Sequence, residues 1–127
     1  MGIPVQTAMI IDDDDDLGQL LGSILETRKI HVLIVNTLEE AEEYLTYLKP
    51  TVIFLDNNFP DGLGVNFISK IKSIDGQIKI IMMTADSSAW IREKAIEEGI
   101  HYFLKKPFSR KAVDCVLDKL NFRKAKA

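Results

Sequence analysis

An acidic run and three later polar residues could together bind a metal ion and a phosphoryl group. Five consecutive aspartates, residues 12–16, follow the apolar segment AMII and precede a second apolar stretch. A run of like charge is by itself typical of a solvated loop. Asp56, Thr84 and Lys106, however, also stand where short apolar segments end. Carboxylates bind hard divalent cations, and lysine and threonine pair with phosphate oxygens, so the function depends on whether the fold brings these groups together.

Five short apolar runs predict the strands that would position these groups. Each run is rich in branched residues and short enough for a strand that is buried on both faces. The runs are AMII (8–11), HVLIV (31–35), TVIFL (51–55), IKIIMMT (78–84) and HYFL (101–104).

The stretches between these runs have the periodicity of amphipathic helices. Thr37 and Glu40 form a capping box for the second predicted helix, which Pro50 stops. A third and weaker helix contains residues 67–71, a fourth runs from Ser87 or Ser88 to Glu98, and a fifth begins near Ser109. The first predicted helix carries one apolar stripe, formed by Leu17, Leu20, Leu21, Ile24 and Leu25, and the fifth another, formed by Val113, Val116, Leu117 and Leu120.

Strands that alternate with helices predict an α/β fold built on a parallel sheet. At this length we expect a five-stranded, doubly wound sheet of the flavodoxin-like type, with strand order 2-1-3-4-5 and five helices. Ligands bind such sheets at the carboxyl ends of the strands. Asp12 and Asp13 follow the first strand, Asp56 follows the third, Thr84 ends the fourth and Lys106 follows the fifth. Their side chains should therefore converge on one pocket.

Three carboxylates in one pocket raise one another's pKa, so the pocket favours a bound cation. A hard ion with oxygen ligands meets this need, and Mg²⁺ suits a site that keeps open positions for water and a phosphate. Lys106 and Thr84 would then contact phosphate oxygens. Asp14 to Asp16 have a different expected role, because they precede the first helical stripe, favour the positive end of that helix, and include a candidate for its N-cap.

The composition limits the classes of function. The chain has 127 residues, of which 46% are hydrophobic and 28% charged, so we expect a single soluble domain over 1–127 with its core at about 6–121. The net charge of −3, without a basic stripe, argues against nucleic-acid binding. The single cysteine, Cys115, fits a reducing, cytoplasmic location and should be buried or half-buried. No apolar run approaches the roughly 20 residues that span a membrane.

The chain resembles the receiver domains of response regulators in two-component signalling along almost its entire length. The resemblance rests on four motifs in order, each at a predicted strand end. They are the acidic pair after the first strand, LDNNFPDGLG after the third, MTA after the fourth and KPF after the fifth.

The resemblance implies a role for each matching residue. Asp56 would accept the phosphoryl group from a phosphohistidine of a sensor histidine kinase or phosphotransfer protein. Asp13, Asp56 and the backbone carbonyl of Asn58 would bind Mg²⁺ directly, and Asp12 would bind it through water. Mn²⁺ or Ca²⁺ can substitute for Mg²⁺ in this family. Lys106 would pair first with Asp56 and then with the phosphoryl group, and the bond before Pro107 is often cis.

The resemblance also implies a conformational switch. Thr84 would close onto the phosphoryl group, and Phe103, immediately before LKKPF, would follow it inward by packing alone, since it lacks the hydroxyl of the usual tyrosine. Asn58 and Asp86 would tune the lifetime of the phosphate. The chain would act as a switch more than as an enzyme with turnover. A downstream target or output domain, or a second copy of the phosphorylated chain, would use the fourth and fifth helices, where Trp90 is either a core residue or part of that surface.

Other functions are less consistent with the sequence. A haloacid-dehalogenase-type phosphatase would use Asp12 as nucleophile and Asp14 as acid, and would need Asp114 and Asp118 as a late acidic pair. A calcium loop at residues 12–23 lacks the required glycine and glutamate. A receiver-like module without phosphorylation is disfavoured because each expected chemical group is present. The cognate kinase, and whether an output domain follows LNFRKAKA, stay open.

Overall fold

The computed structural model describes residues 6–85 and 88–122 and contains a five-stranded parallel sheet. The strands lie in the order β2-β1-β3-β6-β7, and each neighbouring pair is parallel. When only these strands are counted along the chain, the order is the predicted 2-1-3-4-5. The strands are β1 (Thr7–Ile11), β2 (His31–Val35), β3 (Val52–Asp56), β6 (Lys79–Thr84) and β7 (Tyr102–Lys105).

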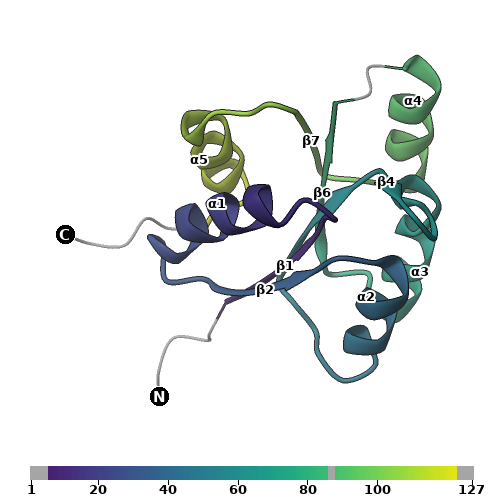
Figure 1. Ribbon diagram of the computed structural model, residues 1–127, viewed down its shortest axis with the longest axis horizontal. Coiled ribbons are helices and arrows are strands. Elements are labelled where there is room, and N and C mark those ends of the chain that lie inside the picture. Colours follow the sequence, from purple (N-terminus) through teal and green to yellow (C-terminus); the bar gives the residue numbers. More distant parts are fainter. Residues whose placement is uncertain (1–5, 86–87, 123–127) are drawn as a thin grey trace.

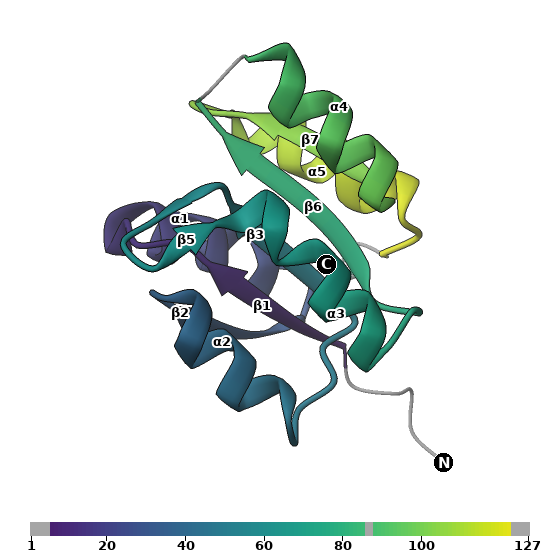
Figure 2. The same cartoon turned by 90° about the vertical axis from the view of Figure 1, so that its right-hand side faces the viewer.

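Helices cover both faces of the sheet, which makes the fold doubly wound (Figure 1). One face is covered by α1 and α5, and the other by α2, α3 and α4, which lie in front of the sheet in Figure 2. The helices are α1 (Asp15–Glu26), α2 (Leu38–Leu45), α3 (Ile68–Ile74), α4 (Ala89–Glu98) and α5 (Arg110–Lys119). The predicted α/β fold is confirmed.

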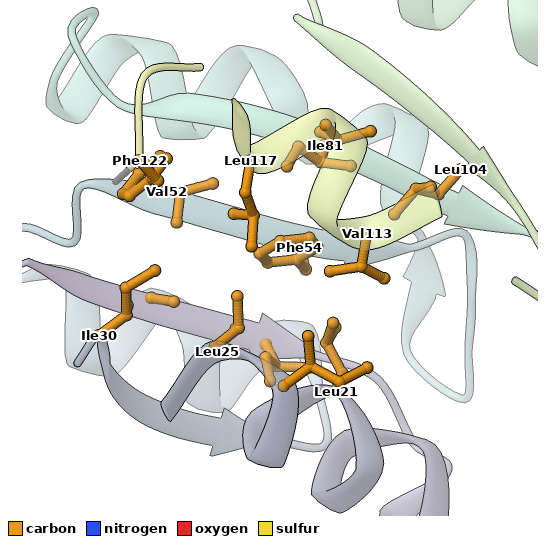
Figure 3. Packing of buried hydrophobic residues seen from close by; sticks show 14 of the residues in the cluster. Leu21, Leu25, Ile30, Val52, Phe54, Ile81, Leu104, Val113, Leu117 and Phe122 are labelled. Carbon is orange, nitrogen blue, oxygen red and sulfur yellow. The ribbon is translucent and has the colours of Figure 1, made fainter. Parts of the chain in front are cut away.

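Each face of the sheet has its own hydrophobic core, because alternate residues of each strand point to opposite faces. Val52 and Phe54 of β3 pack with Leu21 of α1 and Leu117 of α5 (Figure 3). Ile53 and Leu55 pack on the opposite side with residues of α2 and α3. The central strand is thus buried on both faces, as its uninterrupted apolar sequence predicts.

The buried face of α1 differs from the predicted stripe. Leu20 is 57% exposed, whereas Gly18 and Gly22 are buried. The helix lies close to β2, where a Cβ on Gly18 would be 3.1 Å from Ile34 Cγ2. The small residues of α1 therefore face β2, and Leu20 faces solvent.

The helix ends follow the capping residues of the sequence. The side chains of Asp14, Thr37 and Ser109 accept hydrogen bonds from backbone N–H groups in the first turns of α1, α2 and α5. Ser88 stands at the N-cap position of α4, and Ser87 and Asp86 lie outside the described residues. α4 ends at Gly99, whose φ of 91° is in the left-handed region that glycine tolerates.

Two side chains lie closer to solvent than a core position allows. Trp90 on α4 is 54% exposed, so of its two possible roles the core position is excluded. Cys115 is exposed, and the expectation that it is buried or half-buried is wrong. It lies on α5 between the buried Val113 and Val116, and the helical period turns it outward.

A small hairpin between β3 and α3 was not predicted from the sequence. It consists of β4 (Asn58–Phe59) and β5 (Gly62–Leu63) and leads into a 3₁₀ turn, η1 (Gly64–Asn66). Gly64 is required there, because a Cβ would lie 1.9 Å from the carbonyl oxygen of Asp56. The chain that leaves the hairpin thus lies against the last residue of the central strand.

Arg28 joins the end of α1 to α5 and to the chain beyond it. Its side chain is only 2% exposed and forms ion pairs with Asp114 at 3.0 Å and Asp118 at 2.9 Å. It also donates to the backbone carbonyls of Asp114 and Phe122. These contacts place the end of the described chain against α1.

Candidate functional site

Three aspartates meet at the carboxyl edge of the sheet. One carboxylate oxygen from each of Asp12, Asp13 and Asp56 lies within 4.8 Å of the others. β1 and β3 are neighbours with Ile11 opposite Leu55, so the residues that follow, Asp12 and Asp56, are also adjacent. Asp12 is fully buried and Asp56 is 6% exposed, whereas Asp13 is exposed. The predicted convergence of these side chains is therefore observed.

Lys106 connects two of these carboxylates. Its Nζ lies 2.7 Å from Oδ2 of Asp12 and 3.2 Å from Oδ1 of Asp56. The backbone N–H of Lys106 donates to the carbonyl of Thr84 at 2.9 Å, which places the residue just beyond the edge of the sheet. The Lys106–Pro107 peptide bond is cis. The expected contact with Asp56 is present, but the shorter contact is with Asp12.

Burial and neighbouring charge set the protonation of the site. Burial, and secondly the charge of Asp12, raise the pKa of Asp56, and the opposing influence of Lys106 is too small to reverse this. Burial alone would lower the pKa of Lys106. Its hydrogen bond to Asp12 and the charges of Asp56 and Asp12 outweigh burial and raise that pKa. The ammonium group is thus held charged beside a carboxylate that is costly to ionise.

The polar groups of Asp12 are held from several directions. Its backbone N–H donates to the carbonyl of Val35 at 3.0 Å, and its Oδ1 accepts from the N–H of Asp14 at 2.9 Å. The side chain of Asn36 donates to its carbonyl oxygen at 3.1 Å. Asp14 in turn caps α1 by accepting from the N–H of Leu17. The acidic run therefore divides into residues of the site and residues that begin the helix.

Thr84 lies on β6, which is next to β3, and Phe103 lies on β7 at the edge of the sheet. Thr84 is the last residue of β6 and is 1% exposed. Phe103 lies on β7, is half-buried against the core on the α2–α4 side, and has the guanidinium of Arg92 at 5.6 Å from its ring centroid. Lys105, the last residue of β7, is exposed. No described residue other than Lys106 places a cation within ion-pair distance of Asp12 or Asp56.

The chemistry of these groups fits a magnesium ion. Carboxylate oxygens are the ligands that Mg²⁺ prefers, and the three oxygens are close enough to share one ion. The raised pKa of Asp56 also indicates a site that a cation would relieve. Asn58 is exposed at the start of β4, two residues beyond Asp56.

Three contacts near the site were not predicted. Asn36 holds the backbone of Asp12, and the buried Asn57 accepts from the N–H of Val65 at 3.0 Å. Asp61 accepts from the N–H groups of Leu38 and Glu39. Asn36 directly follows the second strand at the same edge as the aspartates, and this position was the one sequence signal that could have identified it.

The arrangement does not support the phosphatase alternative. Asp114 and Asp118, which it needs as a late acidic pair, lie on α5 and bind Arg28. Asp14, its proposed acid, caps α1. These side chains have structural partners, and they do not join the cluster of Asp12, Asp13 and Asp56.

Comparison with known proteins identifies the family. Residues 8–117 match the family model described as the response regulator receiver domain. The transcriptional regulatory protein CitB of Klebsiella pneumoniae is 32% identical over 103 residues, which are 80% of this chain and 44% of that protein. The response regulator protein PilR of Pseudomonas aeruginosa is 30% identical, over 80% of this chain and 23% of its own length. The chain thus spans less than half of either relative.

Solved structures share the whole fold. A two-component response regulator from Clostridium difficile is 26% identical, with a TM-score of 0.87 over 93% of this chain and 97% of that one. The beryllofluoride-activated NtrC4 receiver domain dimer is 36% identical, with a TM-score of 0.83 over 91% of this chain and 95% of that one. Among the described residues, no helix has both the length and the apolar character to cross a membrane. On its sequence, its fold and the acidic cluster at its sheet edge, the chain belongs to the response regulator receiver domains of two-component systems.

Proposed function

We propose that Asp56 is the phosphoacceptor of this receiver domain. The observation that carries the proposal is the cluster of Asp12, Asp13 and Asp56 with Lys106 bridging two of its carboxylates. An oxygen of the Asp56 carboxylate would attack the phosphorus of a phosphohistidine. The new O–P bond gives an acyl phosphate, the P–N bond breaks, and the electron pair of that bond returns to the imidazole of the donor.

Lys106 has the position to stabilise this transfer. Its charged Nζ lies 3.2 Å from Asp56, so it can follow the negative charge from the carboxylate to an oxygen of the phosphoryl group. Its second contact, with Asp12, keeps it at the site while the charge moves. Fixed charge of this kind is the main way in which proteins assist phosphoryl transfer.

The proposed metal site uses oxygen atoms only. Asp13, Asp56 and the backbone carbonyl of Asn58 would hold Mg²⁺ directly and Asp12 would hold it through water, with Mn²⁺ or Ca²⁺ as substitutes. The ion would neutralise charge on the phosphoryl oxygens. Thr84 would then close onto the phosphoryl group and Phe103 would move inward with it, which would alter the exposed surface of α4 and β7.

The proposed partners are a histidine kinase or phosphotransfer protein upstream and a target or output domain downstream. The exposed Trp90 and Ile96, at 54% and 60%, support a downstream contact through α4. NtrC4, whose activated receiver is a dimer, supports association of this chain on phosphorylation. We assign the chain to the cytoplasm, in accord with its single free cysteine, and to signalling by a stored phosphoryl group, without substrate turnover.

Acetyl phosphate tests the proposed phosphoacceptor. With Mg²⁺ present, the wild-type chain should gain the mass of one phosphoryl group, and Asp56→Asn should not. Asp16→Asn, at an exposed aspartate of the same acidic run, is the matched control and should be phosphorylated like wild type. An adduct that persists in Asp56→Asn and maps to Asp12 would refute the assignment and restore the phosphatase alternative.

A further inference from the structure

The residues that lead from β2 into the first turn of α2 contact both loops that carry the proposed metal ligands. We call this segment, residues 36–39, the β2–α2 brace. On one side, Asn36 Nδ2 donates to the carbonyl oxygen of Asp12 at 3.1 Å and to Oδ1 of Asp15 at 2.8 Å. On the other side, the N–H groups of Leu38 and Glu39 donate to the carboxylate of Asp61 at 3.3 Å and 3.0 Å.

The contact made by Asn36 bears directly on the ligand Asp13. The carbonyl of Asp12 belongs to the peptide group that joins Asp12 to Asp13, so its orientation also sets the backbone of Asp13. The other polar groups of Asp12 are held by β2, by Asp14 and by Lys106. Asn36 is the described side chain that holds this carbonyl, and its second bond, to the Asp15 carboxylate, is charge-assisted.

The contact made by Asp61 bears on the proposed ligand Asn58. Asp61 lies in the turn of the hairpin that begins with Asn58, and its two carboxylate oxygens bind adjacent N–H groups at the start of α2. The same turn packs on this helix end, because a Cβ on Gly62 would lie 3.3 Å from Leu38 Cδ1. The exposed Asp61 thus fixes the hairpin against α2 by geometry as well as by its favourable charge at the helix N-terminus.

We propose that Asn36 and Asp61 are positioning residues for Mg²⁺, which set the separation of the two ligand-bearing loops through the β2–α2 brace. The proposal rests on the proposed function of Asp13, Asp56 and Asn58 as metal ligands. Neither residue touches the ion. Each holds the backbone of a loop that presents a ligand, as the outer partners of metal ligands do in other sites.

Mg²⁺ affinity tests the β2–α2 brace without any need for phosphorylation. Calorimetric titration of the full chain with Mg²⁺ should show binding weakened on the order of 10-fold in Asn36→Ala and in Asp61→Ala, the lower end of the loss typical for outer partners of ligands. Thr37→Ala is the matched control. It removes the N-cap of α2 within the same segment but no bond to either loop, and its Mg²⁺ affinity should stay within about twofold of wild type.

Two further measurements separate the proposed positioning role from an effect of the Asp61 charge and from a general loss of stability. Asp61→Asn removes the charge but keeps one acceptor oxygen, so it should bind Mg²⁺ more tightly than Asp61→Ala. With acetyl phosphate, Asn36→Ala should need more Mg²⁺ for half-maximal phosphorylation but should reach the wild-type rate at saturating Mg²⁺. A lower rate at saturation with an unchanged requirement would contradict the positioning role.

The outcomes distinguish this inference from the proposed function. If the wild-type chain binds no Mg²⁺, the metal site and the brace are both wrong. If wild type binds and Asn36→Ala binds equally well, the brace alone is wrong. A loss in Thr37→Ala as large as that in Asn36→Ala would also overturn it, because any loosening of α2 would then suffice.

Discussion

At the scale of single residues, Asp56 shows a conflict between stability and chemistry. The nucleophile has to be ionised, yet burial and the charge of Asp12 raise its pKa and make the ionised form the costly one. Lys106 offsets part of this cost through its contacts with both carboxylates. A shifted pKa that serves no structural purpose is typical of functional sites.

Asp56→Asn is therefore expected to stabilise the chain when no divalent cation is present. The amide keeps the shape of the carboxylate and removes the unfavourable charge, so the midpoint of thermal unfolding should rise by roughly 2–6 °C at pH 7. Circular dichroism measures this rise. A lower midpoint than wild type at pH 7 would show that the ion pair with Lys106 outweighs burial.

The pH dependence of this difference has a definite sign. Between the ordinary and the raised pKa of Asp56 the native state binds more protons than the unfolded chain, so wild-type stability falls as the pH rises through that window. The advantage of Asp56→Asn should thus be complete above the raised pKa of Asp56 and disappear as the pH falls toward the ordinary value of about 4. A constant difference between pH 4 and 8 would contradict the assigned cause.

Gly64 is a second residue on which the site depends. In Gly64→Ala the new Cβ would meet the carbonyl oxygen of Asp56 at 1.9 Å, so the backbone has to move. We expect a loss of about 1–3 kcal/mol in the free energy of unfolding, as for overpacking elsewhere, together with weaker Mg²⁺ binding. Gly76→Ala is the control, since its Cβ would meet only the Lys72 carbonyl oxygen at 3.9 Å. Urea unfolding of both variants tests this, and equal stability would exclude a steric role for Gly64.

At the scale of elements, strong periodicity made the sheet and helices predictable. Uninterrupted apolar runs identified the strands, and the strand ends then located Asp12, Asp56 and Lys106. The β4–β5 hairpin has strands of two residues each, too short for any period to appear. The orientation of α1 was missed because close packing of Gly18 on Ile34 outweighs the apolar surface of Leu20.

Contacts between distant elements were not predictable, because they depend on side-chain geometry that no local pattern encodes. Arg28 lies just after α1, where the sequence shows only an ordinary basic residue. Its side chain is nevertheless buried, because it forms ion pairs with Asp114, 86 positions away, and with Asp118 further along α5. The orientations of Cys115 and Trp90 depend in the same way on how each helix lies on the sheet.

Arg28→Ala is expected to lower the free energy of unfolding by at least about 2 kcal/mol. The change removes hydrogen bonds between charged groups and leaves the Phe122 carbonyl without this donor. Arg110→Ala is the matched control, because Arg110 also pairs with Asp114 but is 60% exposed at 3.7 Å, and its loss should cost less than about 1 kcal/mol. Chemical unfolding compares the two, and equal losses would mean that the burial of Arg28 adds nothing.

At the scale of the whole molecule, the carboxyl edge of the sheet and the exposed side of α4 are separate regions, and α4 lies between β6 and β7 in the chain (Figure 1). Thr84 ends β6 beside the acidic cluster, and Phe103 on β7 packs beneath Arg92 of α4. Because β6 and β7 are paired, a change at Thr84 would have a short route through β7 to α4. This arrangement supports the proposed transmission of phosphorylation to α4.

Association on activation should depend on the exposed apolar residues of α4. The variant Trp90→Ala/Ile96→Ala should unfold within about 0.5 kcal/mol of wild type, since both side chains are more than half exposed. After treatment with beryllofluoride and Mg²⁺ it should associate less than wild type in analytical ultracentrifugation. Tyr47→Ala, 74% exposed just beyond α2, is the control and should associate normally. Equal association of all three would place the contact elsewhere.

The exposure of Trp90 also means that intrinsic tryptophan fluorescence can report on binding at α4. It is the one tryptophan in the sequence, and more than half of its surface already faces water. Its fluorescence should therefore change little in emission wavelength when the chain unfolds, and should shift to the blue when another molecule covers α4. Without any added dye, the emission wavelength of Trp90 would distinguish a bound receiver from a free one.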